Sequence, residues 1–111
     1  MDEVDQLGDD NKMIDKVKEK LKGSGYEEKA AQSLAERLAA SEVIREQLLK
    51  WVENNEETDC RYEEFSVFAL MRERRFTYPN ALNTIAWLHN APDIARKALT
   101  SGVDRIVKGE R

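Results

Sequence analysis

Residues 77–79 (TYP) and 90–93 (NAPD) decide the fold, because each stretch joins the end of one helix to the start of the next. Proline fits the first helical position, where its missing N–H costs nothing. Glycine or asparagine, here Asn90, can adopt the left-handed backbone that stops a helix. Residues 23–27 (GSGYE) and 40–42 (ASE) are two further junctions of this kind. These four junctions predict an all-α fold, a compact single-domain bundle of five to six short helices.

Apolar residues at helical spacing locate the helices between these junctions. The expected ranges are about 11–22, 25–40, 42–54, 60–75, 79–89 and 92–108. The 60–75 segment is apolar nearly all round, which is typical of a helix buried on more than one side, so we expect it to be the central helix. Gly102 interrupts the last helix at a cost of about 1 kcal/mol relative to alanine, which predicts a slight kink or a close crossing. No stretch predicts a strand.

The start of the chain and one internal break set the expected domain organisation. Residues 1–10 are acidic and lack an apolar period, which predicts a flexible N-terminal tail ahead of a single helical domain at 11–109. Continuing the apolar stripe of the second helix would bring Ser41 and Arg45 inside, so we expect that helix to end or bend at Ser41. One bent helix over 25–54 and two separate helices are both compatible with the pattern.

Local signals set the expected helix ends. Ser24 and Glu27 form an S-x-x-E pair, the sequence of a capping box in which each side chain bonds a free backbone N–H of the other residue. Gly23, just before this pair, is the expected left-handed stop of the first helix. Thr58 or Asp59 can cap the fourth helix, since both side chains accept hydrogen bonds from the first N–H groups of a helix.

The formal net charge of −4 hides an asymmetry along the chain. Residues 1–60 carry 16 acidic and 9 basic side chains, whereas residues 61–111 carry 6 and 9. A globally acidic chain argues against non-specific nucleic-acid binding, yet its basic half leaves room for a local basic face. The same asymmetry would suit head-to-tail self-association.

Neither a membrane span nor a secretory signal is expected from the sequence. The apolar run at 67–71 (VFALM) is far shorter than the roughly 20 residues of a spanning helix. The start at 1–5 (MDEVD) is acidic and lacks the basic-then-apolar order of a signal peptide. Cys60 is the single cysteine, so no internal disulfide can form. We therefore expect a cytoplasmic protein.

The sequence offers few residues for catalysis or metal binding. Cys60 and His89 are the only cysteine and the only histidine, and they fall on different expected helices, whereas nucleophilic catalysis needs such groups side by side. Ala86 stands where a Glu-x-x-His metal pair would need its glutamate. The loop at 53–59 (ENNEETD) could bind a divalent cation weakly, although such a run is more often a solvated loop. We expect no enzymatic activity, no cofactor and no metal.

Aromatic side chains concentrate near a run of arginines in the C-terminal half of the chain. Tryptophan, tyrosine and arginine dominate binding hot spots, so we expect a binding surface at the corner between the fourth and fifth helices, with Tyr78 and Trp87 part-exposed. This surface consists of Arg72, Arg74, Arg75, Phe76, Tyr78 and Trp87. The sequence thus predicts a non-enzymatic protein–protein interaction module, an adaptor, regulator or small subunit that acts with a protein partner or as a homodimer.

The alternative is a small nucleic-acid-binding protein that uses a helix-turn-helix-like pair at 79–108. The tight connection at 90–92 has about the right length for such a pair, and the arginines within 72–75 would be available for phosphates. The second helix would carry the nucleic-acid contacts Arg96, Lys97, Arg105 and Lys108. Against this alternative, Asp93 stands where the second helix would approach DNA, and ordinary helix packing produces the same pattern.

Overall fold

The computed structural model describes the backbone of residues 2–102 and 105–108 and the side chains of residues 11–102, 107 and 108. It confirms the all-α fold, because six helices within these residues are at least seven residues long. A 3₁₀ turn, a short hairpin and a four-residue helix complete the described elements. In chain order they are α1 (Asp2–Gly23), α2 (Glu28–Ala40), η1 (Glu42–Ile44), α3 (Arg45–Asn54), β1 (Arg61–Tyr62), β2 (Phe65–Ser66), α4 (Val67–Glu73), α5 (Tyr78–Asn90), α6 (Pro92–Ser101) and α7 (Arg105–Lys108).

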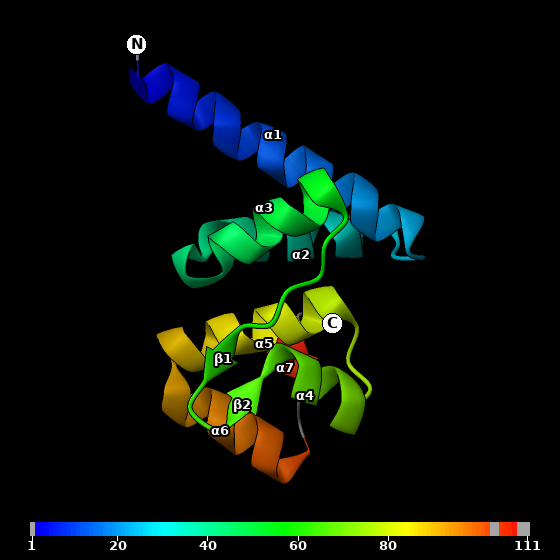
Figure 1. The fold of residues 1–111 in the computed structure, drawn as a ribbon, viewed down its shortest axis with the longest axis vertical. Helices are drawn as coiled ribbons and strands as arrows, with labels where there is room; N and C mark the ends of the chain where they lie inside the picture. Colours follow the sequence, from blue (N-terminus) through cyan, green and yellow to red (C-terminus); the bar gives the residue numbers. More distant parts are fainter. Residues whose placement is uncertain (1, 103–104, 109–111) are drawn as a thin grey trace.

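The helices stack in layers in a body of 45 × 28 × 24 Å (Figure 1). Helix α1 covers one side of the pair α2 and α3, and α5 packs against the other side. Helices α4, α6 and α7 and the hairpin surround the far side of α5. A single apolar core runs through these layers and includes Val17 of α1, Leu38 of α2, Leu82 of α5 and Leu99 of α6.

Helix α5, rather than the segment at 60–75, is the central helix. Ten of its 13 residues are buried, and it packs against α2, η1, α4, α6, α7 and both strands. Its sequence suits this position because it contains no lysine, arginine, aspartate or glutamate. Two neutral polar side chains of α5 find bonds inside the fold: Thr84 Oγ1 donates to Asn80 O at 2.9 Å, and the Asn83 amide donates to Val107 O. An apolar period alone therefore misidentifies the central helix.

The segment expected as one helix at 60–75 begins with a hairpin, so α4 starts only at Val67. Strands β1 and β2 are antiparallel, and Tyr62 faces Phe65 across the pair. Glu63 lies in the turn between them with a left-handed φ of 52°. Cross-strand aromatic pairs stabilise such ladders, which explains why these residues leave the helical pattern.

Two side chains cap the start of α4. The Ser66 hydroxyl accepts a hydrogen bond from Ala69 N at 3.2 Å, and the Asp59 carboxylate accepts one from Phe68 N at 3.0 Å. Asp59 therefore has the capping role expected of it, but for a helix that begins seven residues later than the sequence predicts. The side-chain oxygen of Thr58 is buried and bonds no described residue.

The left-handed stop of α1 is Gly25 rather than Gly23. Gly25 has a φ of 107°, whereas Gly23 is the last residue of the helix itself. Backbone bonds of 3.1 Å join Tyr26 N to Leu21 O and Gly25 N to Lys22 O. This pair of bonds is the Schellman pattern, which satisfies the last carbonyl groups of a helix.

The expected capping box at the start of α2 is wrong. Helix α2 begins at Glu28, and its N-cap Glu27 makes no side-chain capping bond. The Ser24 hydroxyl donates instead to Lys20 O at 3.2 Å. Because residues 24–26 close the end of α1, Ser24 lies too early in the chain to reach the first N–H groups of α2.

The expected break at Ser41 is confirmed. Helix α2 ends just before this residue, which has φ −95° and ψ 116°, and η1 and α3 follow it. Residues 25–54 are therefore not one bent helix. Ser41 itself is only 6 % exposed, in line with its place on the apolar stripe of α2.

Helix α1 starts at Asp2, earlier than the start near residue 11 that the sequence predicts. Acidic residues are favourable in the first turn of a helix because they lie at the positive end of its dipole, and residues 2–10 contain several of them. The apolar period that located the helix begins only later. That residues 1–10 form a flexible tail stays a prediction.

Gly102 ends α6, so residues 92–108 do not form one kinked helix. This glycine has a left-handed φ of 79°, and the chain then returns as α7, which packs on α5 and α6. Val107 of α7 is fully buried. Residue 109, the expected end of the domain, lies outside the described residues.

Asn90 does not adopt the left-handed stop expected of it. Helix α5 ends at Asn90, and the next residue, Ala91, has φ −144° and ψ 71° and donates its backbone N–H to Trp87 O at 2.7 Å. Pro92 explains this geometry, because a proline disfavours the helical backbone at the residue before it.

Candidate binding groove between α2 and α5

Two aromatic side chains of the expected binding surface belong to the core. Phe76 is 5 % exposed and Tyr78 is 2 % exposed, so the prediction that Tyr78 is part-exposed is wrong. The Tyr78 ring lies 5.7 Å from the Trp51 ring between centroids. Its hydroxyl donates to Thr58 O and accepts from Thr58 N, both at 3.0 Å, and burial raises the pKa of this hydroxyl. These bonds allow the polar end of the ring to be buried.

The three arginines of the expected surface have separate environments. Arg72 is exposed and lies 3.8 Å from the Glu73 carboxylate. Arg74 Nη1 donates to Leu99 O at 3.1 Å, which ties α4 to α6. Arg75 follows α4 with a left-handed φ of 59°. The arginines and the aromatic side chains therefore do not form one anchor patch.

The residues expected to contact nucleic acid lie on separate elements. Arg96 of α6 pairs with both glutamates of the hairpin turn, and Lys97 is exposed on the same helix. Lys108 belongs to α7, with its ammonium 5.1 Å from the centroid of the Phe76 ring. The side chain of Arg105 lies outside the described residues. A single recognition helix carrying all four residues is therefore wrong, while nucleic-acid binding itself stays a prediction.

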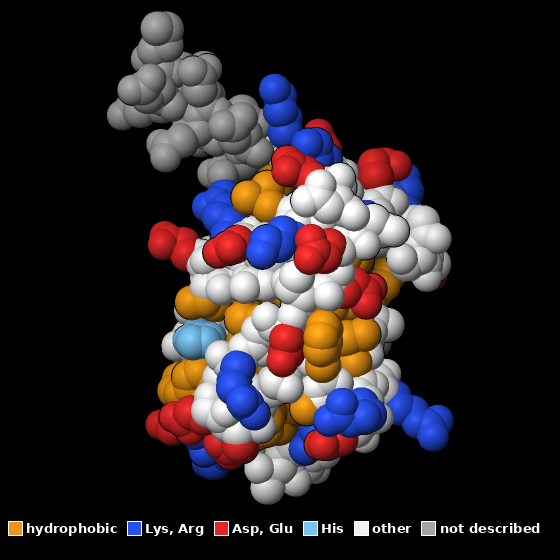
Figure 2. Space-filling model, in the orientation of Figure 1, with side chains coloured by type: hydrophobic (Ala, Val, Ile, Leu, Met, Phe, Trp, Pro, Cys, Tyr) orange, Lys and Arg blue, Asp and Glu red, His pale blue; other side chains and the backbone are white. Residues whose placement is uncertain are grey.

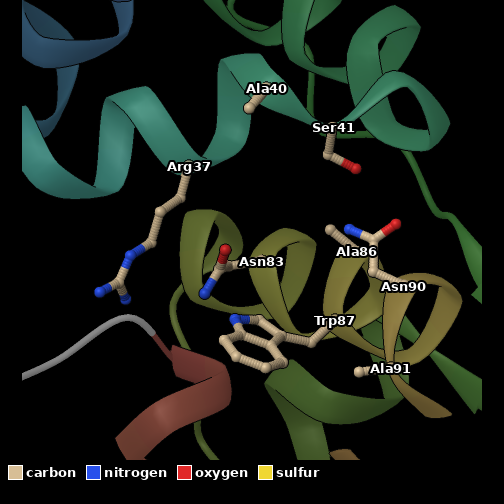
Figure 3. A pocket seen from close by; sticks show the side chains of 8 residues that line it. All are labelled: Arg37, Ala40, Ser41, Asn83, Ala86, Trp87, Asn90 and Ala91. Carbon is tan, nitrogen blue, oxygen red and sulfur yellow. The ribbon is translucent and has the colours of Figure 1, made fainter.

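Trp87 is half-buried, as the sequence predicts, and faces a groove between α2 and α5 (Figure 3). The groove has a cavity volume of about 330 Å³. Its lining consists of Arg37, Ala40, Ser41, Asn83, Ala86, Trp87, Asn90 and Ala91. Three of these residues are alanines, whose short side chains leave room between helices that pack closely elsewhere.

Helical periodicity places these side chains on the facing sides of the two helices. Asn83, Trp87 and Asn90 occupy positions i, i+4 and i+7 of α5, which share one face. Arg37 and Ser41 are one turn apart at the end of α2. Figure 3 shows the Trp87 indole lying along the groove, with Arg37 at one end and Ser41 and Asn90 at the other.

Several polar groups of the groove have no partner within the described part of the chain. The buried hydroxyl of Ser41 has no hydrogen-bond partner there. Arg37 and Asn90 are exposed, and their side chains bond no described residue. Asn83 differs, because its amide donates to Val107 O. A buried polar group without a partner costs about 1–3 kcal/mol, so a rearrangement of the groove that brought a partner to the Ser41 hydroxyl would be favourable.

The described lining of the groove has several hydrogen-bond donors and no negative charge. Arg37 offers a guanidinium, Asn90 an amide and Trp87 an indole N–H. None of the described residues that line the groove is an aspartate or a glutamate. Although the whole chain has a net charge of −4, this site therefore favours an anionic group.

Two other cavities differ from the groove in how their polar groups are used. One lies near the C-terminal ends of α1 and α3, where Lys20 Nζ donates to Asn55 Oδ1 at 2.5 Å and the Tyr26 and Thr77 hydroxyls are 2.8 Å apart. The other is lined by residues of α6 alone. The α2–α5 groove combines two helices, an aromatic ring and polar groups that still need partners.

Sequence reasoning found Trp87 but missed the rest of the groove. Two features of the sequence pointed to the remaining groove residues. Ser41 falls on the inward stripe of α2. Asn83 and Asn90 share a face with Trp87 on a helix that has no carboxylate or ammonium group. The contribution of Arg37 depends on the approach of α2 to α5, which no local pattern reveals.

The two residues considered for catalysis have structural surroundings. Cys60 is half-buried, and burial raises the pKa of its thiol, so the thiol stays protonated at neutral pH. His89 is exposed and packs edge-on against Tyr62, with ring centroids 4.7 Å apart. Among the described side chains, no three His, Cys, Asp or Glu residues are grouped as a metal site requires.

The described residues define a small all-α protein with a donor-rich concave site between two of its helices. No protein-family model matches the chain, and no curated protein or solved structure matches it. None of the helices in the described part of the chain combines the length and the apolar character needed to cross a membrane. A function for this chain therefore has to be inferred from the groove.

Proposed function

We propose that this chain is a non-enzymatic, cytoplasmic protein-interaction module that binds a segment of a partner protein in the α2–α5 groove. The observation that carries this proposal is a groove that holds the half-buried Trp87 and, at one end, an Arg37 that bonds no described residue. Tryptophan and arginine provide much of the binding energy at protein interfaces, especially when they lie in a concave site. An adaptor, a regulator or a small subunit would use such a site.

The chemistry of the lining supports recognition rather than catalysis. Ser41 is the one hydroxyl in the described lining, and the lining has no histidine, carboxylate or lysine to accept its proton. A serine nucleophile needs such a base within hydrogen-bond reach. Amide, guanidinium and indole groups instead bind and orient a ligand.

The ends of the groove support a polypeptide as the ligand. Arg37 and Asn90 lie at opposite ends and are both exposed, so a bound segment can continue past either end. The volume of about 330 Å³ is at the small end of the range for binding pockets. It suits one or two side chains of a segment whose remaining residues stay outside.

The experiment that tests this function is selection of random twelve-residue peptides, displayed on phage, against the immobilised protein. We expect peptides that bind the wild type and are lost with Trp87→Ala. Because Trp87→Ala removes a half-buried ring, Ala40→Gln serves as a second variant. Ala40 lines the groove but is exposed, so a longer side chain there blocks the groove without removing any packed group.

Arg72→Glu is the matched control, since Arg72 is exposed on α4 and does not line the groove. Circular dichroism verifies that each variant is folded. Selected peptides that bind Trp87→Ala and Ala40→Gln as well as the wild type would show that this groove is not the binding site. A selection that yields no binding peptide would also contradict the proposal.

A further inference from the structure

We infer that the partner segment is an extended acidic peptide, with a carboxylate on Arg37, an apolar side chain on Trp87 and a backbone amide at Asn90 and Ser41. This inference rests on the proposed function and specifies its ligand. It follows from the order of groups along the groove: Arg37 stands at one end, the Trp87 indole lies in the middle, and Ser41 and Asn90 stand at the other end (Figure 3).

The carboxylate is assigned from charge complementarity. Arg37 makes no ion pair with any described residue, and no acidic side chain of the described lining competes for it. A guanidinium binds a carboxylate through two parallel N–H···O bonds, and the indole N–H of Trp87 adds another donor. Phosphorylated segments are usually bound by clusters of arginines, whereas Arg37 is the one basic residue of the described lining.

The backbone contact is assigned from the amide of Asn90 and the hydroxyl of Ser41. A side-chain amide offers both a donor and an acceptor, which matches a peptide unit of an extended chain. The Ser41 hydroxyl oxygen is closed to solvent and has no partner in the described chain, so a peptide N–H or C=O bonds it only after a small movement of the groove wall, and that bond then removes an existing cost. In Figure 3 the Ser41 hydroxyl and the Asn90 amide approach the same end of the groove from opposite helices.

The length of the groove limits how far apart the recognised residues of the peptide can be. Asn83 and Asn90 are seven residues apart on α5, which corresponds to about 10 Å along a helix. An extended chain covers this distance in about three residues. The acidic residue and the large apolar residue of the partner should therefore lie within about three positions of each other.

The test reads the sequences of the selected peptides and then measures their affinities. We expect enrichment of aspartate or glutamate within about three positions of a large apolar residue. A synthetic selected peptide should bind at least about tenfold more weakly after Asp→Asn or Glu→Gln replacement, and also after Arg37→Glu in the protein, because both changes remove the charge-assisted pair. Versions of the peptide with a free and an amidated C terminus separate a side-chain carboxylate from a terminal one.

Arg37→Glu gives a further readout, because it reverses the charge of an exposed residue without changing the packing. A new selection on this variant should favour lysine or arginine where the wild type favours an acid, and Arg72→Glu should keep the wild-type preference. Selected peptides that depend on Trp87 and Ala40 yet lack an acid and tolerate Arg37→Glu would overturn this inference and leave the proposed function intact. Peptides that ignore Trp87, Ala40 and Arg37 would overturn both.

Discussion

The side-chain amide of Asn83 donates a 2.5 Å hydrogen bond to the carbonyl oxygen of Val107. Asn83 is 2 % exposed and Val107 is fully buried, so the bond joins the central helix α5 to the C-terminal helix α7 inside the core. A polar contact at this depth does two things at once. It satisfies a carbonyl at the end of a short helix, and it fixes one wall of the α2–α5 groove, because Asn83 also lines that groove.

Asn83→Ala should lower the free energy of unfolding by about 1 kcal/mol, because the Val107 carbonyl loses its short bond and keeps only the 3.4 Å bond from Thr84 Oγ1. Urea denaturation followed by circular dichroism measures the change. Asn90→Ala is the matched control, since Asn90 lies on the same helix but is exposed and bonds no described residue, and its effect should stay within about 0.5 kcal/mol. Equal losses in the two variants would show that the bond to Val107 contributes nothing specific.

Alanine substitutions should have opposite effects at two glycines. Gly102 has a φ of 79°, a conformation that costs a residue with a Cβ about 1–2 kcal/mol, so Gly102→Ala should destabilise the protein by that amount. Gly23 is helical, and a Cβ added there meets no atom within 4 Å, so Gly23→Ala should stabilise by about 0.4–1 kcal/mol. Thermal unfolding of both variants checks the signs. A stabilising Gly102→Ala would contradict the assigned end of α6.

The buried hydroxyl of Tyr78 should make the stability depend on alkaline pH. Burial raises the pKa of this hydroxyl in the folded protein above its unfolded value of about 10. The folded state therefore favours the neutral phenol. The corresponding stabilisation is complete below about pH 10 and is lost as the pH rises through the raised, folded-state pKa.

Tyr78→Phe tests this dependence, because phenylalanine keeps the ring in contact with Trp51 and removes the titrating group. The difference in unfolding free energy between wild type and variant should be constant below about pH 10 and shrink above it. Ultraviolet absorbance of the phenolate gives a direct second reading, since Tyr78→Phe removes the tyrosine hydroxyl whose pKa burial raises. Identical alkaline profiles of wild type and Tyr78→Phe would refute the assignment.

Fluorescence quenching should report the charge of the groove without any ligand. The chain has two tryptophans, so Trp51→Phe isolates Trp87 and Trp87→Phe isolates Trp51. Iodide should quench Trp87 more strongly than caesium does, because Arg37 in the same groove attracts the anion. Trp51 is 4 % exposed and should be protected from both ions. Arg37→Glu should reverse the preference at Trp87, and an unchanged ratio would mean that Arg37 does not set the local charge.

The fold could be predicted from the sequence where local chemistry decides the structure. At the start of α5, Thr77 caps the helix by accepting from Asn80 N at 3.4 Å, and Pro79 lies in the first turn. These are backbone effects of single residues, so they act in any tertiary setting. The break at Ser41 was predictable for a similar reason, since the polar residue falls where the apolar stripe would continue.

Prediction failed where tertiary contacts override the local pattern. Residues 60–75 have a helical apolar pattern, yet Tyr62 and Phe65 pair across a hairpin. The groove shows the same limit. Trp87 stands out by residue type alone, whereas Arg37 becomes relevant only because α2 lies beside α5. Pairs of residues 50 positions apart in sequence have no signature in a single chain.

The most direct test of the groove follows the two indole N–H resonances of the wild-type protein, labelled with nitrogen-15, while a selected acidic peptide is added. The peptide should shift the Trp87 resonance in a saturable manner and leave that of the buried Trp51 in place. In Arg37→Glu the same shift of the Trp87 resonance should need at least about tenfold more peptide. A peptide that binds the wild type without moving the Trp87 resonance would contradict binding in the α2–α5 groove.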